Sequence, residues 1–187
     1  MKMYYYYGVM GSSKTANALM KKFSFEEHGK KVILIKPSID TRDGKTLLKS
    51  RVGISCDALL INPEESINDL LKGHENIDII IVDEAQFLSV SQVNELRNLT
   101  LEGIMVMCYG LKTDYMGKLF EGSKRIIELA DTIREIPSMC HCGKKAIMNA
   151  RIQNGKIVYS GNQIDIGGND KYTAMCYKCY IKDYKKQ

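Results

Sequence analysis

The sequence has no apolar run that approaches the roughly 20 residues of a membrane-spanning helix. It also has no internal repeat, no low-complexity segment and no basic stripe. The net charge is only +5, and the one tight group of lysines comprises Lys182, Lys185 and Lys186. We therefore expect neither a membrane nor a nucleic acid as a partner.

The chain begins with Met1 and Lys2, which lead directly into an aromatic run, so we expect no signal peptide and a cytoplasmic location. The six cysteines are not expected to form structural disulfides, because such a compartment is reducing. A chain of 187 residues with 44% hydrophobic residues is large enough for one full domain and a small appendage.

Apolar runs alternate with helical patterns before Pro137. The runs at 32–35, 77–82 and 104–107 are typical of strands buried on both faces, and the aromatic run at 3–7 is typical of a buried strand. The patterns around 16–29, 67–71, 90–96 and 126–130 are typical of helices. This alternation predicts an α/β fold with an open, mostly parallel sheet. Ligands bind beyond the carboxyl ends of such strands, so we expect Gly8, Asp83 and Tyr109, which follow three runs, to line one site.

The octapeptide 8–15 (GVMGSSKT) has the layout of a phosphate-binding loop, in which backbone N–H groups and a helix dipole bind phosphate oxygens. Lys14 would reach the β- and γ-phosphates, and the Thr15 hydroxyl would bind Mg²⁺. The general pattern has glycine where this chain has Ser13. The alternative is a turn that only caps a helix. The residues of the predicted loop are Gly8, Val9, Met10, Gly11, Ser12, Ser13, Lys14 and Thr15.

Two acids, Asp83 and Glu84, follow the apolar run at 77–82. One acid at this position can organise Mg²⁺, and a second can act as a general base. An acidic pair at a strand end is also common as a simple solvated terminus. Together with the loop, however, the pair predicts a site for a nucleoside triphosphate.

Four of the six cysteines lie in the last 50 residues. Large apolar side chains are few there, so this segment needs a metal or a cross-link to stabilise its fold. Four thiolates suit a closed structural Zn²⁺ site, although the first pair has a short spacer, and a redox pair or unrelated buried thiols are the alternatives. We expect His141 to face solvent and Cys56 and Cys108 to be buried thiols. The predicted ligands are Cys140, Cys142, Cys176 and Cys179.

The ordered motifs resemble those of the type II thymidine kinases, the cellular and bacterial family with a RecA-like core. Beyond the loop, they are 36–42 (KPSIDTR), 83–87 (DEAQF), 109–114 (YGLKTD), 120–123 (FEGS), 140–146 (CHCGKKA), 166–172 (IGGNDKY) and 176–179 (CYKC). The resemblance implies a phosphate-loop ATP-binding domain at 1–137 and, at 138–187, a zinc-binding domain that carries the substrate lid. It also implies a homotetramer and a role in the salvage of pyrimidine nucleosides.

The resemblance implies transfer of the ATP γ-phosphate to thymidine, and to deoxyuridine as well. Glu84 would be the general base, Arg42 would stabilise the transferring phosphoryl group, and Asp83, Gln86 and Asp40 would join the loop in binding ATP and Mg²⁺. The other implied residues enclose thymidine. They are Met10, Phe87, Leu111, Tyr115, Phe120, Gln163, Ile164, Asp165, Ile166, Gly167 and, as the closing side chain, Tyr172.

Three positions depart from the family pattern. Ser13 replaces the usual glycine, Gly11 stands where a larger, often aromatic residue is common, and Asp165 stands where an apolar residue is frequent. A serine costs on the order of 1 kcal/mol if the backbone there has positive φ. Two other hypotheses are a phosphate-loop ATPase with a nucleic-acid-binding zinc ribbon, and a nucleotide-binding relative that Ser13 impairs.

Overall fold

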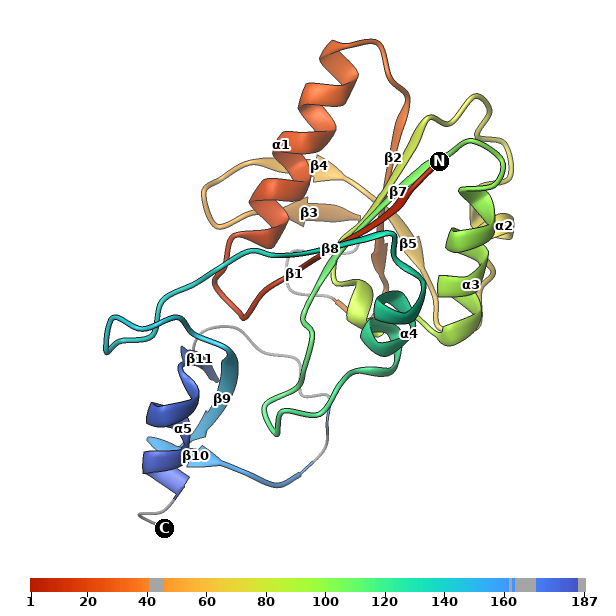
Figure 1. The fold of residues 1–187 in the computed structure, drawn as a ribbon. Coiled ribbons are helices and arrows are strands. Elements are labelled where there is room, and N and C mark those ends of the chain that lie inside the picture. Colours follow the sequence, from red (N-terminus) through yellow and green to blue (C-terminus); the bar gives the residue numbers. More distant parts are fainter. Residues whose placement is uncertain (41–45, 162, 164–170, 185–187) are drawn as a thin grey trace.

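The computed structural model describes residues 1–40, 46–161, 163 and 171–184. Figure 1 shows a larger α/β part, where the chain begins, and a smaller part, where it ends. The larger part contains a six-stranded sheet, and the smaller part contains a three-stranded sheet. The predicted α/β class is therefore confirmed.

All neighbouring strands of the central sheet pair in parallel. Every residue of β2 and β6 is buried, which explains why the sequence of these strands is a continuous apolar run rather than an alternation. In spatial order, the strands are β5 (Leu59–Ile61), β2 (Val32–Pro37), β6 (Ile79–Val82), β7 (Met105–Gly110), β1 (Met3–Tyr7) and β8 (Thr132–Glu135).

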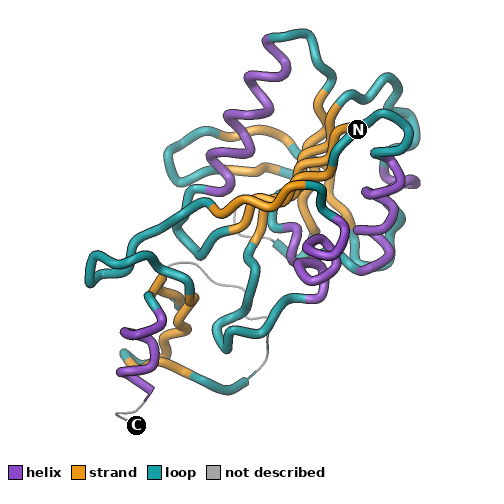
Figure 2. The backbone as a smooth tube through the Cα atoms, viewed as in Figure 1, coloured by secondary structure: helices purple, strands orange, loops and turns teal. Residues whose placement is uncertain are grey.

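Helices cover both faces of this sheet, as Figure 2 shows. Successive side chains of β1 point to opposite faces. Met3 and Tyr5 therefore pack in the core with α3 and α4, whereas Tyr4 and Tyr6 pack on the side of α1. The helices are α1 (Lys14–Glu27) on one face and α2 (Ile67–Leu70), α3 (Val90–Leu99) and α4 (Glu121–Leu129) on the other; a 3₁₀ turn, η1 (Ala85–Phe87), follows β6.

Short elements differ most from the sequence expectations. The helix expected at 67–71 is a single turn, whose first N–H groups are capped by the Ser66 hydroxyl. The sequence analysis did not anticipate β5, β8 or the hairpin of β3 (Leu47–Lys49) and β4 (Ser55–Asp57). Strands of three or four residues form because a neighbouring strand pairs with them, and such pairing leaves no clear pattern in so short a sequence.

The C-terminal part is an antiparallel sheet in the order β10 (Lys156–Val158), β9 (Met148–Gln153) and β11 (Tyr172–Met175), followed by α5 (Tyr177–Tyr184). Its apolar cluster includes Met148, Met175 and Tyr180, and also Val9 of the predicted phosphate loop. The larger part therefore supplies one of the buried residues of the smaller. The boundary at residue 137 stays a prediction.

Within the described ranges, no helix combines the length and the apolar character that crossing a membrane requires.

Candidate active site

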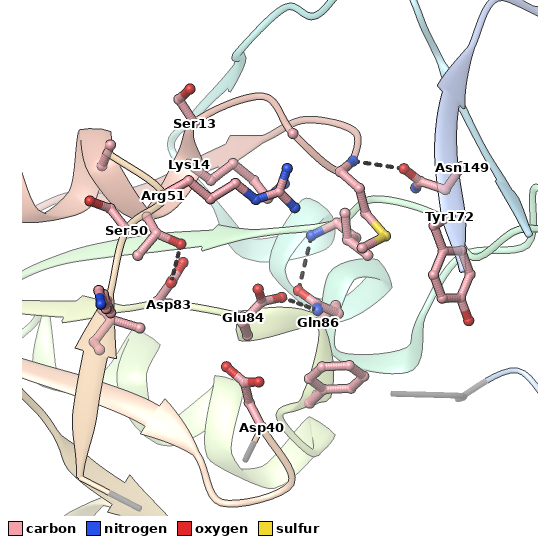
Figure 3. A pocket seen from close by; sticks show the side chains of 18 of the residues that line it. Ser13, Lys14, Asp40, Ser50, Arg51, Asp83, Glu84, Gln86, Asn149 and Tyr172 are labelled. Carbon is pink, nitrogen blue, oxygen red and sulfur yellow. Dashed lines mark hydrogen bonds between the residues drawn. The ribbon is translucent and has the colours of Figure 1, made fainter. Parts of the chain in front are cut away.

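A cavity of about 660 Å³ opens at the carboxyl end of the central sheet (Figure 3). Its walls come from the loop after β1, the turn after β6, the segment after β7 and the β3–β4 hairpin. Asn149 of β9 and Tyr172 of β11 complete the lining from the C-terminal part. The cavity therefore lies where the two parts of the molecule meet.

Most of the predicted site residues gather at this cavity, although their roles stay predictions. Those that line it are Met10, Gly11, Ser13, Lys14, Thr15, Asp40, Asp83, Glu84, Gln86, Phe87, Leu111, Tyr115, Phe120, Gln163 and Tyr172. Gly8 was expected to line the site, but like Val9 and Ser12 it is buried in the loop and does not line the cavity. The remaining predicted residues, Arg42, Ile164, Asp165, Ile166 and Gly167, lie outside the described residues.

The predicted phosphate loop connects the end of β1 to the first residue of α1, Lys14. Gly8 has to be glycine here, since a Cβ atom on it would clash with the hydroxyl oxygen of Ser12 and the carbonyl oxygen of Ile136. The Lys14 ammonium donates hydrogen bonds to the carbonyl oxygens of Gly8 (3.1 Å) and Val9 (2.9 Å). The loop therefore curls around its own lysine at the N-terminus of a 14-residue helix.

Ser13 has the left-handed conformation, with φ 59° and ψ 30°, and its side chain does not cap α1. A positive φ at Ser13 is the case in which serine was expected to cost conformational free energy. A non-glycine residue in this region loses roughly 1 kcal/mol through contact of its Cβ with the backbone. The loop therefore keeps the backbone shape that glycine would adopt freely.

Asp83 is the first residue after β6 and is almost fully buried. The Thr15 hydroxyl donates a hydrogen bond of 2.8 Å to Oδ2 of Asp83, while Oδ1 is buried with no hydrogen-bond partner. Burial, together with the charge of Glu84, raises the pKa of Asp83 to about 7. A buried carboxylate oxygen next to a threonine hydroxyl is a donor set that fits Mg²⁺, which prefers oxygen ligands.

Glu84 also has a left-handed backbone, with φ 50°, as the residue before the η1 turn. Such a conformation costs a glutamate about 1–3 kcal/mol, and it is typical of functional positions. Gln86 holds the side chain in place: its Nε2 donates to Glu84 Oε2 (2.6 Å), and its Oε1 accepts from the Leu111 N–H (2.9 Å). Gly110 makes room for this amide, because a Cβ there would lie 2.6 Å from Gln86 Oε1.

An apolar wall lies beside the two acids. Phe87 and Phe120 pack edge to face, with ring centroids 5.8 Å apart and planes at 75°. Tyr115 is buried, and its hydroxyl has no hydrogen-bond partner among the described residues. Gln163 is exposed at the rim, where its Nε2 donates to the Leu119 carbonyl (3.3 Å). The wall can therefore pack against the faces of a flat ring and offers few polar groups to it.

Asn149 is a site residue that the sequence analysis missed. It is 3% exposed, and its side chain bridges two segments: Oδ1 accepts from the Met10 N–H (2.8 Å) and Nδ2 donates to the Thr113 carbonyl (3.1 Å). Because an asparagine inside a short strand belongs to no recognised motif, only the tertiary contact reveals its position. Asp114 and hairpin residues 48–53 also line the cavity without having been expected there.

Tyr109 corrects the sequence expectation. It was expected to follow a strand and line the site, but β7 continues to Gly110, so Tyr109 lies within the strand and is fully buried. Its ring stacks on Tyr6 at 4.8 Å, its hydroxyl donates to Asn17 Oδ1 of α1 (3.0 Å), and burial raises its pKa. Tyr109 therefore packs α1 against the sheet, and Leu111 is the β7 neighbour that reaches the cavity.

The four predicted cysteine ligands converge. The sulfur atoms of Cys140, Cys142, Cys176 and Cys179 all lie within 4.8 Å of one another. The Cys142 and Cys176 sulfurs are 3.6 Å apart, close to the about 3.8 Å expected between thiolates on one tetrahedral Zn²⁺. These residues could therefore hold a zinc ion.

The remaining expectations for cysteines and histidine mostly agree with the structure. His141 is exposed, and Cys108 is fully buried, as expected. Cys56 was expected to be buried but is only half-buried, because it lies in the short hairpin strand β4 rather than in the central sheet.

Known proteins resemble this chain over nearly its whole length. The family model described as thymidine kinase matches residues 1–180. Similar relatives are the thymidine kinases of Zymomonas mobilis (40% identical, covering 97% of this chain and 96% of the relative) and Streptococcus pyogenes serotype M3 (42%, covering 96% and 97%). The thymidine kinase of Rhodopirellula baltica is 37% identical over 94% of this chain and 85% of the relative. This chain belongs to the thymidine kinase family.

Proposed function

We propose that the protein transfers the γ-phosphate of ATP to the 5′-hydroxyl of thymidine, which yields thymidine monophosphate and ADP. The observation that carries the proposal is the arrangement of one cavity, in which a phosphate loop, two acids and an apolar wall meet. A phosphate loop alone would suit any ATPase. The enclosed apolar wall beside Glu84 is the feature that an acceptor nucleoside requires.

The donor half of the site consists of the loop and Asp83. Loop N–H groups and the N-terminus of α1 attract phosphate oxygens. Lys14 exchanges its hydrogen bonds to the Gly8 and Val9 carbonyls for bonds to the phosphates. Thr15 and Asp83 would hold Mg²⁺, which when bound neutralises charge on the phosphates. The unpartnered Oδ1 of Asp83 is the observation that supports this assignment.

The acceptor half depends on Glu84. Its carboxylate accepts the proton of the 5′-hydroxyl while that oxygen forms a bond to the γ-phosphorus, and the bond from this phosphorus to the β,γ-bridging oxygen breaks. The hydrogen bond from Gln86 fixes the carboxylate, and the strained backbone keeps it at the end of β6. A fixed base is effective because it needs no reorganisation when the substrate binds.

The apolar wall binds the thymine ring and excludes water. Phe87, Phe120 and Tyr115 supply flat surfaces for a base, and Tyr172 closes the cavity from the C-terminal part. Exclusion of water favours transfer to the nucleoside over hydrolysis of ATP. Deoxyuridine, which lacks only one methyl group, would bind as a weaker substrate, since one methyl in an apolar pocket is worth about 1–3 kcal/mol.

The cysteine cluster would hold a structural Zn²⁺, because four thiolates leave no coordination position for a substrate. Its part in the reaction is to keep β9 and β11, and with them Asn149 and Tyr172, at the edge of the cavity. A homotetramer, which the family resemblance implies, is the assembly that light scattering should detect.

A transfer assay with labelled ATP tests the proposal. Thymidine should accept phosphate, deoxyuridine should accept it more slowly and deoxycytidine should not. Glu84→Gln should lower kcat by about 10²- to 10⁴-fold, the usual contribution of a general base, while ATP affinity changes little. Thymidine-independent hydrolysis together with salt-sensitive polynucleotide binding would instead favour an ATPase that engages nucleic acid.

A further inference from the structure

The hairpin of β3 and β4 places an arginine at the phosphate loop. Residues 48–53, the end of β3 and the turn after it, line the cavity, and Arg51 lies in the middle of that turn. In the view of Figure 3, the Arg51 side chain extends from the hairpin into the space between the loop and Glu84. No motif in the sequence assigns a role to this residue.

The turn that carries Arg51 is well fixed. The Ser50 N–H donates to the Ile54 carbonyl (2.8 Å), the Ile54 N–H donates to the Ser50 hydroxyl (3.1 Å), and the Gly53 N–H donates to the Ser50 carbonyl (3.0 Å). Ser50 is 4% exposed, so these bonds are shielded from water. The position of the Arg51 backbone therefore follows from the hairpin, and only its side chain has freedom.

The Arg51 guanidinium lies close to Gly11, the loop residue that has no side chain. A Cβ atom on Gly11 would be 3.5 Å from Nη1 of Arg51, and Gly11 has φ 76°, a conformation that disfavours any larger residue. Within the described ranges, Arg51 forms no hydrogen bond and no ion pair, although Asp40, Asp83 and Glu84 line the same cavity. Its five N–H donors therefore have no partner among the residues that the structure describes.

We propose that Arg51 binds the phosphate chain of the nucleoside triphosphate, as a second side-chain cation beside Lys14. This assignment rests on the proposed function, which places a triphosphate at the loop. The planar guanidinium can donate two hydrogen bonds to one phosphate, whereas the Lys14 ammonium acts as a point charge. Four carboxylates line the same cavity, so a polyanion there gains from an added positive charge.

The test measures the affinity of a non-hydrolysable ATP analogue with Mg²⁺, by calorimetry, for the wild type and three variants. Arg51→Met keeps the length of the stem and removes the charge, and it should weaken binding by roughly 10- to 100-fold, the worth of one charged hydrogen-bonding group. Arg51→Lys should recover part of the loss. The control Arg134→Ala removes an exposed charge from β8, away from the cavity, and should leave the affinity within about twofold.

Thymidine affinity, measured on the same variants, separates phosphate binding from damage to the hairpin, and it should not change. Equal analogue affinities of Arg51→Met and the wild type would overturn the assignment, as would equal losses of thymidine and analogue binding. The wild-type transfer assay keeps the two proposals apart. Failure of transfer together with a selective loss in Arg51→Met would reject the kinase but keep Arg51 as a phosphate ligand.

Discussion

The α/β part and the C-terminal part achieve their structure by different means. The central sheet buries two apolar clusters, one on each face, and its interior strands are completely covered. The C-terminal part buries one small cluster, which includes Cys140 and Cys176 and also Val9 of the larger part. The larger part can therefore fold on its apolar surface alone, whereas the smaller part depends on its cysteines and its neighbour.

Residues of both parts line the cavity, so the proposed function requires both. The proposed donor half, with Lys14 and Asp83, belongs to the larger part, whereas Asn149 and Tyr172 belong to the part that a metal would stabilise. The larger part therefore supplies most of the apolar core, whereas both parts supply residues to the cavity.

Removal of the metal should have the largest effect. A chelator should unfold the C-terminal sheet and α5, because a structural zinc site contributes about 10 kcal/mol or more to folding. The amide protons of β9 and β11 should then exchange quickly while those of β1, β6 and β7 stay protected. Hydrogen exchange followed by mass spectrometry measures this, and metal analysis should find about one zinc per chain.

Two variants control that experiment. Cys176→Ser should reproduce the effect of the chelator, whereas Cys56→Ser, in the half-buried β4 strand, should not. A fully folded, metal-free C-terminal part would refute the role assigned to the cluster.

The second-largest effect should be a pH dependence of the unfolding free energy that comes from Asp83 in the larger part. The pKa of Asp83 is raised from 3.8 to about 7 in the folded protein. Between these values the unfolded chain has lost a proton that the folded protein keeps. Stability without Mg²⁺ should therefore fall as pH rises from 4 to 7, by on the order of a few kcal/mol.

Urea unfolding at several pH values, with Asp83→Asn as the matched variant, checks this. The variant cannot titrate and should lose that part of the slope, and added Mg²⁺ should flatten the slope of the wild type. Identical slopes for wild type and variant would show that Asp83 titrates normally.

Loss of the Asn149 side chain, which links the two parts, should lower the unfolding free energy by less than the two changes above. Asn149→Ala leaves the Met10 N–H and the Thr113 carbonyl without their partner, which should cost about 2 kcal/mol in unfolding free energy. Asn149→Asp keeps the acceptor for Met10 but not the donor, and it should lose less. Thermal unfolding gives the order of the variants; an unchanged melting temperature in Asn149→Ala would rule out the bridge.

Ser13→Gly should have the smallest effect, a gain of about 1 kcal/mol, because glycine adopts the left-handed conformation without strain. The matched control is Asn154→Gly in the C-terminal part. Asn154 also has positive φ (51°), but asparagine tolerates it better, so the gain should be smaller. Denaturant unfolding compares the two, and a destabilised Ser13→Gly would mean that the serine side chain contributes to the loop.

Much of the fold could be predicted because the relevant signals are local. The apolar runs that became β1, β2, β6 and β7 had to be buried strands, since their length and composition suit no exposed element. The loop at 8–15 and the acid pair at 83–84 were predicted for the same reason, as each lies directly at a strand end. Tyr109 was misplaced because β7 ends three residues later than the expected run at 104–107, an uncertainty that local patterns always leave.

Local patterns were enough to predict the parallel α/β core, the loop after β1, the acid pair after β6 and the cysteine cluster, because each is a short pattern with its own chemistry. The left-handed backbone at Ser13 and Glu84, the bridge at Asn149 and the approach of Arg51 to Gly11 became visible only in the folded structure. These features join residues far apart in the chain, or depend on strain that the whole fold imposes. No local pattern encodes them, since their energy comes from packing that exists only once the chain has folded.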